Sequence, residues 1–238
     1  MKYIATVLLL ATMIPAAMAA KKKASPYFVY DQADETVKAT MLEGGGEIYD
    51  PGIASTKEGI WLTWLKFTPG KGDEIYVALR PEAGKAVSKT FGRYARPTLT
   101  TDAAGKLWLT YESFDEKAQQ WDIFIRAHLG GGKFDAPQQV STSKSNDINH
   151  RVSPDPKSGL WVIWQTDCQG QFDILARRVG VKQFGEVEKI ASSSVSQWSP
   201  SIAVSSDGTV TAAWDEYNRQ SYHVVIHRRT KGKWAPSG

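Results

Sequence analysis

Four segments of the chain share one pattern of glycine, apolar and aromatic positions. Gly59-Ile-Trp-Leu-Thr-Trp64 and Gly159-Leu-Trp-Val-Ile-Trp164 are the clearest copies, and Gly105–Tyr111 and Gly208–Trp214 each carry one extra residue. The closing aromatic residues are separated by 47, 53 and 50 residues. Self-similarity at a fixed period indicates a repeat protein, and units of about 40 to 50 residues built from strands alone are typical of propeller blades.

The residues around each copy alternate between strand and turn signals. In the last repeat, Ser199–Ser205 is a predicted first strand, Asp207-Gly208 a hairpin turn, and Thr209–Trp214 a second strand. Tyr222–Arg229 is the predicted third strand of that repeat. The other repeats add predicted fourth strands at Ala86–Thr90, Gln138–Thr142 and Glu186–Ile190. Four antiparallel strands per unit predict an all-β fold, a β-propeller.

The predicted second strand is apolar on both faces. Trp61 and Trp64 are three residues apart, so on a strand they point to opposite sides of the sheet. A sheet stacked between two others buries both sides, and the tryptophans are therefore expected to be packing residues first. A platform on which a carbohydrate stacks is the alternative.

The repeats divide the chain into about four blades and a part. The predicted boundaries are 47–92, 93–146, 147–196 and 197–238, with the last repeat incomplete. Residues 21–46 contain Tyr27–Tyr30 and Thr36–Thr40, which resemble the third and fourth strands of a partial N-terminal blade. Two interpretations stay open: an irregular four-bladed ring, or the front part of a larger protein, which we favour. An incomplete ring would leave strand edges exposed and predicts a dimer.

The N-terminus has the pattern of a secretory signal peptide over residues 1–20. Lys2 precedes an apolar run, Ile4–Ile14, which is too short to span a bilayer, and Ala17-Met-Ala19 supplies small residues for cleavage. Later stretches of the sequence are shorter than the ~18 apolar residues of a membrane helix. The sequence therefore predicts a secreted protein, periplasmic or extracellular, without a membrane span.

Charge and metal-ligand patterns exclude several classes of function. The signal holds one lysine, so its removal takes the formal net charge from +4 to +3, and the basic residues are scattered, which argues against a nucleic-acid partner. Cys168 is the only cysteine and cannot form an intramolecular disulfide; it is expected to lie in a turn, Thr166-Asp-Cys-Gln-Gly170. His223 and His227 would lie about 13 Å apart on one strand, too far to share an ion. We expect neither a metal nor another cofactor.

The repeats resemble a known group of proteins. Three motifs are similar to those of sialidase-like and TolB-like bacterial secreted propellers: Pro200-Ser-Ile-Ala-Val204 followed by Asp207-Gly208, Asp173-Ile-x-x-Arg177, and Gly131-Gly-Lys-Phe134. The resemblance covers about residues 47–236 and implies the fold more than any chemistry, because such repeats are structural. The Asp-box motif reads Ser-x-Asp-x-Gly-x-Thr-Trp, and Thr101–Trp108 and Ser206–Thr209 match it only in part.

Polar residues just before each predicted first strand are the candidate ligand-binding group. They are cationic and aromatic, and arginine forks suit a carboxylate, sulfate or phosphate. The group consists of Asp50, Arg93, Arg96, His150, Arg151 and Trp198. A second, acidic group follows the second strands and is expected on the opposite rim: Glu112, Asp115, Asp167, Asp215 and Glu216. The alternative for the arginines is that they bridge neighbouring blades.

These patterns predict a binding or scaffold module that recognises an acidic glycan or a protein. One alternative is a sialidase-like glycoside hydrolase, in which Arg93, Arg96 and Arg151 would hold a substrate carboxylate while a tyrosine or a carboxylate pair performs the chemistry. Another is the N-terminal propeller of a larger, truncated enzyme. The sequence assigns no catalytic residue.

Overall fold

The structure is a computed structural model in which the chain divides into two compact units, Met1–Ile48 and Tyr49–Gly238. It describes residues 28–33, 36–41, 47–80, 82–168, 170–180, 183–191, 193–218 and 220–237. The expected signal peptide, 1–20, lies outside the described residues. Among the residues that are described, no helix has the length and apolar character needed to cross a membrane.

The first unit contains one antiparallel pair of strands, β1 (Phe28–Ala33) and β2 (Thr36–Met41). The register runs from Phe28 opposite Met41 to Ala33 opposite Thr36. These strands overlap the two that the sequence predicts for a partial N-terminal blade. The rest of the predicted segment, 21–27 and 42–46, lies outside the described residues.

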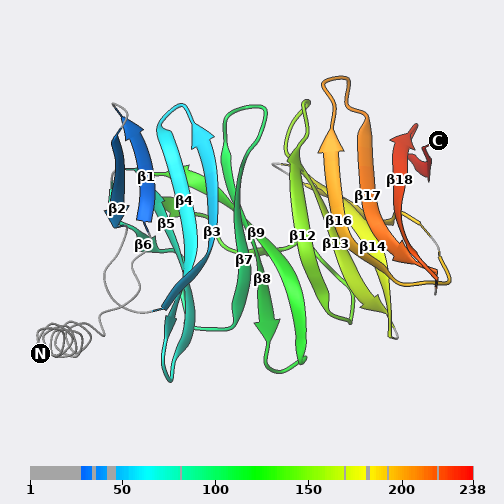
Figure 1. Ribbon diagram of the computed structural model, residues 1–238, viewed down its shortest axis with the longest axis horizontal. Helices are drawn as coiled ribbons and strands as arrows, with labels where there is room; N and C mark the ends of the chain where they lie inside the picture. The colour runs from blue at the N-terminus through cyan, green and yellow to red at the C-terminus, as the bar shows by residue number, and fades with distance from the viewer. Residues whose placement is uncertain are drawn as a thin grey trace, which may run out of the picture. The chain divides into compact units, whose positions relative to one another are not determined.

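From Glu47 onward the chain forms four antiparallel sheets whose strands follow chain order (Figure 1). The first sheet consists of β3 (Glu47–Thr56), β4 (Gly59–Thr68), β5 (Gly72–Leu79) and β6 (Lys85–Ala86). The second consists of β7 (Tyr94–Thr101), β8 (Leu107–Asp115) and β9 (Gln120–Gly130), with β10 (Lys133–Phe134) and β11 (Gln138–Gln139) both paired to β9.

The third and fourth sheets repeat this order. The third consists of β12 (Asp147–Pro154), β13 (Leu160–Cys168), β14 (Gln171–Val179) and β15 (Phe184–Lys189). The fourth consists of β16 (Gln197–Val204), β17 (Val210–Tyr217), β18 (Tyr222–Thr230) and β19 (Lys233–Pro236).

Two expectations about strands need correction. The last repeat was expected to be incomplete, but it has its fourth strand, because positive-φ residues Lys231 (51°) and Gly232 (81°) reverse the chain and let β19 pair with β18. Cys168 ends β13 instead of lying in a turn, because the hairpin pairing continues to Cys168 opposite Gln171.

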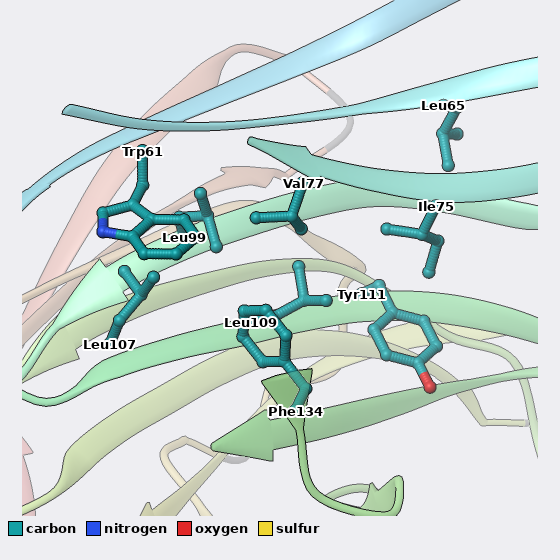
Figure 2. Close-up of a cluster of buried hydrophobic side chains, with 9 residues drawn as sticks. All are labelled: Trp61, Leu65, Ile75, Val77, Leu99, Leu107, Leu109, Tyr111 and Phe134. Carbon is teal, nitrogen blue, oxygen red and sulfur yellow. The ribbon is translucent and has the colours of Figure 1, made fainter. Parts of the chain in front are cut away.

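Hydrophobic side chains pack between consecutive sheets. In the cluster between the first and second sheets, Trp61 and Val77 meet Leu109 and Tyr111 (Figure 2). The tryptophan pair of β13 is divided between two such clusters: Trp164, 0% exposed, packs with second-sheet residues, and Trp161, 3% exposed, packs with fourth-sheet residues. Both faces of the second strand are therefore buried, as its sequence predicts.

In the second, third and fourth sheets, a side chain of the third strand links its sheet to the preceding one. Arg126 donates from Nη1 to the carbonyl of Val87, and Arg177 Nη1 donates to the carbonyl of Val140 at 2.8 Å. His227, at the same cross-strand position in the fourth sheet, has Nδ1 3.3 Å from the carbonyl of Ile190. Bridging between blades is thus performed by the arginines of the Asp-Ile-x-x-Arg motif.

The Asp-containing turns between first and second strands are structural. Asp102 is buried, and its carboxylate accepts the backbone N–H of Lys106 at 2.9 Å and the indole N–H of Trp108 at 2.9 Å. In the fourth sheet, Asp207 accepts the backbone N–H of Thr209 at 2.9 Å. These carboxylates close hairpins and anchor a core tryptophan.

Candidate functional site

The first strands of the second, third and fourth sheets carry an irregularity at the same place. The pairing register shifts between Ala95 and Thr98 in β7, between Ile148 and Arg151 in β12, and between Trp198 and Ser201 in β16. In each case two residues face one on the neighbouring strand, which defines a β-bulge. Bulges re-aim side chains and are over-represented beside active sites.

The three bulges, and the equivalent position before Pro51 in β3, hold four non-glycine residues in the left-handed region of backbone conformation. Their φ values are 57° for Asp50, 50° for Arg96, 57° for Asn149 and 52° for Ser199. Non-glycine residues adopt positive φ only when the surroundings enforce it, and such residues concentrate at ligand clamps and active sites. We call the end of the sheets that carries these four residues the bulge rim.

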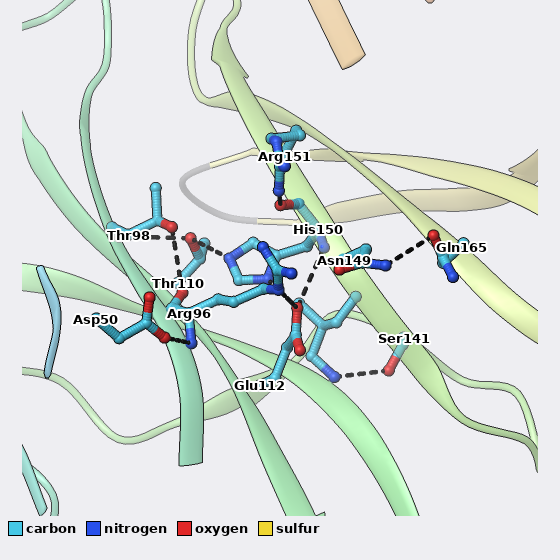
Figure 3. Close-up of polar contacts among 11 residues, drawn as sticks. Asp50, Arg96, Thr98, Thr110, Glu112, Ser141, Asn149, His150, Arg151 and Gln165 are labelled. Atoms are coloured by element: carbon cyan, nitrogen blue, oxygen red, sulfur yellow. Dashed lines mark hydrogen bonds and ion pairs between the residues drawn. The ribbon is translucent and has the colours of Figure 1, made fainter. Parts of the chain in front are cut away.

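Side chains of one sheet hold the bulge of the next. Asp50 accepts the backbone N–H of Arg96 at 2.5 Å, and Glu112 accepts that of His150 at 3.2 Å. Gln165 accepts the backbone N–H of Ser199 at 3.2 Å and the side-chain amide of Asn149 at 2.8 Å. The bulge rim is therefore fixed by hydrogen bonds between sheets (Figure 3).

Glu112 and His150 form the buried centre of the bulge rim. Glu112 Oε1 lies 3.0 Å from His150 Nδ1, and His150 Nε2 lies 3.2 Å from the hydroxyl of Thr110. Arg96 Nε lies 3.8 Å from the same Glu112 oxygen. Because a carboxylate only accepts hydrogen bonds, His150 donates from Nδ1. The result is a chain of polar contacts from Arg96 through Glu112 and His150 to Thr110.

This chain has the order of a hydroxyl–histidine–carboxylate triad, but its burial argues against catalysis. Thr110, His150 and Glu112 are 1%, 2% and 3% exposed. A nucleophile must reach the reacting atom of a substrate. We therefore assign this cluster a positioning role: it orients the exposed side chains around it.

The exposed side chains at the bulge rim are those that a ligand can reach. Arg96 has a side chain 43% exposed. Arg151 is exposed, and its Nη1 donates to the carbonyl of His150 at 2.9 Å. Both arginines thus contact the Glu112–His150 pair (Figure 3). Trp198 is half-buried, with its ring 6.4 Å from that of Tyr222.

Arg93 has a different environment from the other candidates. Its guanidinium lies 3.8 Å from the ring centre of Phe114 and 5.5 Å from that of Trp121. Its Nη1 is also 3.8 Å from a Glu116 oxygen. The structure therefore brings Arg96, His150 and Arg151 together around Glu112 and places Arg93 on an aromatic pair of its own sheet.

The expected acidic group on an opposite rim is wrong. Glu112 lies opposite Ala95, and Asp215 lies opposite Trp198, in the strand registers. Antiparallel pairing places the end of a second strand beside the start of its first strand, so both groups share one end of the sheets. Of the acidic group, Glu112 contacts the cationic candidates, because its Oε1 lies 3.8 Å from Arg96 Nε and 3.0 Å from His150 Nδ1.

Several residues of the bulge rim were not candidates from the sequence. Asn149 and Ser199 occupy the bulge position, and Gln165 and Thr110 hold it from the neighbouring strand. One available signal is the alignment of the repeats on the residue before proline, as in Asp50-Pro51, Arg96-Pro97 and Ser199-Pro200. The pairing partners carry no comparable mark.

The carboxyl of Asp147, near the start of β12, has a pKa above its ordinary value. Burial raises the pKa of its carboxyl, and hydrogen bonds from Thr166, Ser143 and Trp164 oppose the rise. The Trp164 indole N–H donates to Asp147 Oδ1 at 2.9 Å, and the Ser143 hydroxyl donates to Oδ2 at 2.8 Å. An asparagine carries no charge; its oxygen can accept from the Trp164 indole, and its amide N–H can donate to the Ser143 hydroxyl oxygen.

Asp147→Asn should gain stability relative to the parent as pH rises. A raised folded-state pKa means that the carboxyl contributes most below its unfolded value of about 3.9 and loses that contribution as pH rises through the folded value. Urea unfolding at acidic and neutral pH measures the difference. Asp207→Asn is the control of opposite sign, because the Ser205 hydroxyl and the backbone of Thr209 lower the pKa of Asp207. An unchanged difference for Asp147→Asn at both pH values would contradict this account.

Metal-ligating side chains do not gather at the bulge rim. Within the described part of the chain, no group of three or more histidine, cysteine, aspartate or glutamate side chains could hold an ion. The chemistry available at the rim is hydrogen bonding and ion pairing by arginine, asparagine and carboxylate groups.

Comparison with known proteins places the fold. No family model and no curated protein matches the sequence. An α-L-arabinanase from Penicillium chrysogenum complexed with arabinobiose matches with a TM-score of 0.54 at 14% identity, over 78% of this chain and 64% of that one. An endo-arabinase from Bacteroides thetaiotaomicron matches with a TM-score of 0.53 at 15% identity, over 87% of each chain. TolB from Acinetobacter baumannii matches with a TM-score of 0.55 at 15% identity, over 89% of this chain and 49% of that one.

At these identities the likeness concerns the fold alone. The expected likeness to TolB is found at that level, and the likeness to sialidases stays a prediction. The four-stranded antiparallel sheets and the structural matches together show that the chain has an all-β, propeller-type fold.

Proposed function

We propose that the chain is a glycan-binding propeller whose ligand, a sugar carrying an anionic group, sits at the bulge rim. The observation that carries the proposal is the set of four polar residues of positive φ at equivalent positions of the four first strands, three of them in β-bulges. Backbone strain repeated at equivalent positions favours a recognition surface over a purely structural one.

The side chains of the bulge rim have the chemistry for such a ligand. Arg96 and Arg151 offer planar guanidinium groups, which bind carboxylates and sulfates in bidentate fashion. Asn149 supplies an amide that can hydrogen-bond hydroxyl groups, and half-buried Trp198 supplies an aromatic surface. Asp50 and Glu112 accept the backbone N–H groups of Arg96 and His150, so the backbone beneath both arginines is partly pre-organised.

The structural comparisons support a carbohydrate ligand over other anions. The arabinanase is a propeller-type relative in fold that is complexed with a disaccharide. Fold similarity alone does not establish function, so the argument rests on the side chains at the rim. Export of the protein remains a prediction that suits an extracellular or periplasmic glycan.

Binding of an acidic oligosaccharide to three variants tests the proposal. Arg96→Ala and Arg151→Ala should each weaken the affinity roughly 10- to 100-fold, the effect of losing a hydrogen bond to a charged group. Lys133→Ala removes a positive charge from an exposed residue of β10. Lys133 lies beside the turn between β9 and β10, at the other end of the sheet from the bulge rim, so the variant should leave the affinity unchanged. Calorimetry with a sialylated and a neutral oligosaccharide measures the affinity of the parent and of each variant. Equal affinity in all variants would contradict the proposal.

A sialidase-like hydrolase is the second candidate, favoured by one contact. The Tyr49 hydroxyl donates to Asp73 Oδ1 at 2.5 Å, and Tyr49 is 38% exposed. A hydroxyl nucleophile with a carboxylate base in hydrogen-bond reach is the arrangement that covalent catalysis needs, and sialidases use tyrosine in this role. Arg96 and Arg151 would then hold the substrate carboxylate.

Turnover separates the two candidates. A binding module releases no product from a sialoside, whereas a hydrolase loses its activity in Tyr49→Phe and keeps its ligand affinity. Asp50→Asn is the companion variant, since Asp50 holds the Arg96 backbone and lies beside Tyr49. Product release abolished by Tyr49→Phe would replace the binding module by the hydrolase.

A further inference from the structure

The fourth sheet has an apolar face that the described chain leaves open. Tyr222, Val224 and Ile226 of β18 are 72%, 71% and 43% exposed. The residues between them face the third sheet: Val225 packs on its core cluster, and the His227 ring lies 4.8 Å from that of Trp214. The strand therefore has two apolar faces, and only one is covered. We call the other the β18 face.

The equivalent face of the third sheet is buried against a neighbouring sheet. Ile226 lies opposite Ala213, as Ala176 lies opposite Ile163 in the third sheet. Val224 therefore corresponds to Ile174. Ile174 and Ala176 are 0% exposed, because the fourth sheet covers them. The β18 face thus has the composition of the buried interface between two sheets, and contiguous exposed apolar surface marks an interaction site.

The charges on the β18 face are complementary to themselves. Asp215 lies opposite Val224, and Arg228 lies opposite Thr211, so both side chains share the face of Val224 and Ile226. The row of Asp215 and Val224 is four positions along the strand from the row of Thr211 and Arg228, a distance of about 13 Å. The apolar row of Ala213 and Ile226 lies midway between them. Consider two copies packed face to face, with a two-fold axis that runs along this row in the plane between them. The strands of the two copies are then antiparallel, and Asp215 of each copy lies against Arg228 of the other.

We propose that the chain forms a two-fold dimer through the β18 face. Two-fold interfaces use the same patch on both copies, and the apolar centre flanked by opposite charges meets that requirement. The apolar rows contribute burial, and the two ion pairs set the antiparallel orientation. The proposal does not rest on glycan binding, because Arg96 and Arg151 play no part in it; Trp198, which lies opposite Asp215, adjoins both surfaces.

Sedimentation of the full chain over a range of concentrations tests the dimer. Ile226→Lys places a charge at the centre of the interface and should raise the dimer dissociation constant by ~100-fold or more. Ile53→Lys is the matched control, since Ile53 is 65% exposed on β3 of the first sheet and lies outside the β18 face. Circular dichroism establishes that both variants are folded.

Charge reversal tests the orientation. Asp215→Arg or Arg228→Asp alone should raise the dissociation constant roughly tenfold, because each creates two like-charged contacts. The double variant restores both pairs and should return to within about threefold of the parent. A mass of one chain at every concentration would overturn the proposal. So would a dimer that Ile226→Lys leaves intact, or single reversals that the double variant does not rescue.

Discussion

Replacing Trp164 by alanine is expected to lower the free energy of unfolding by about 3–5 kcal/mol, the range for deleting a large buried aromatic side chain. Trp164 is fully buried between the second and third sheets. Its loss also removes the indole N–H that donates to buried Asp147 at 2.9 Å. Urea unfolding of the parent and the variant measures the difference.

Trp198→Ala is the matched comparison for Trp164. Trp198 is half-buried at the bulge rim, outside the three core clusters, and its substitution should cost less than about half as much. If ligand binding involves Trp198, this variant loses affinity while the fold persists. Equal destabilisation by the two substitutions would contradict the division of tryptophans into core and ligand-facing groups.

Glu112→Ala is expected to cost about 2–4 kcal/mol of stability. The substitution leaves the His150 imidazole and the His150 backbone N–H without their acceptor in a region that is almost fully buried. The contact with Arg96 contributes little to this figure, because Arg96 is partly exposed and solvent screens the pair. Thermal unfolding should show a fall of roughly 5–15 °C for a chain of this size.

Two further variants give this prediction its controls. Glu116→Ala removes a carboxylate that pairs with Arg93 at 3.8 Å, with both side chains more than half exposed, and should change stability by less than about 0.5 kcal/mol. Glu112→Ala combined with His150→Ala should show a coupling energy of about 1–3 kcal/mol. Additive effects would mean that Glu112 and His150 do not act as one unit.

The sequence predicts the fold well because its repeats encode packing. Apolar residues on both faces of the second strand, as at Trp161 and Trp164, require a sheet on each side, and the structure places one there. The glycine turns likewise predict the order of strands within each sheet. Short outer strands such as β6 are predicted less well, because two pairs of residues leave little periodic signal.

The geometry of the bulge rim depends on features that a linear pattern does not display. The one-residue shift between Ala95 and Thr98 is a property of pairing, and it decides that Arg96 adopts positive φ. The candidates Asp50, Arg96, His150 and Arg151 are found from their place before the strands. Glu112 and Gln165, which accept hydrogen bonds from the bulge backbone, lie on a neighbouring strand or sheet. They can be identified only once the antiparallel registers are known.

The linking role of arginine also illustrates this limit. Arg126 and Arg177 recur in the Asp-Ile-x-x-Arg motif, so the sequence marks them as repeated. Their partners are backbone carbonyl groups of Val87 and Val140, which have no sequence signature. The bridging function, expected of the arginines before first strands, therefore belongs to residues that sequence reasoning treated as part of a motif.

Hydrogen–deuterium exchange with and without an acidic oligosaccharide tests the central claim, that the bulge rim is the ligand site. The account predicts slower exchange in peptides that contain the bulges at Arg96, Asn149 and Ser199. It predicts unchanged exchange at the far turn, Gly130–Gly132, which connects β9 and β10. Protection confined to the far turn, with the three bulges unaffected at saturating ligand, would contradict the claim.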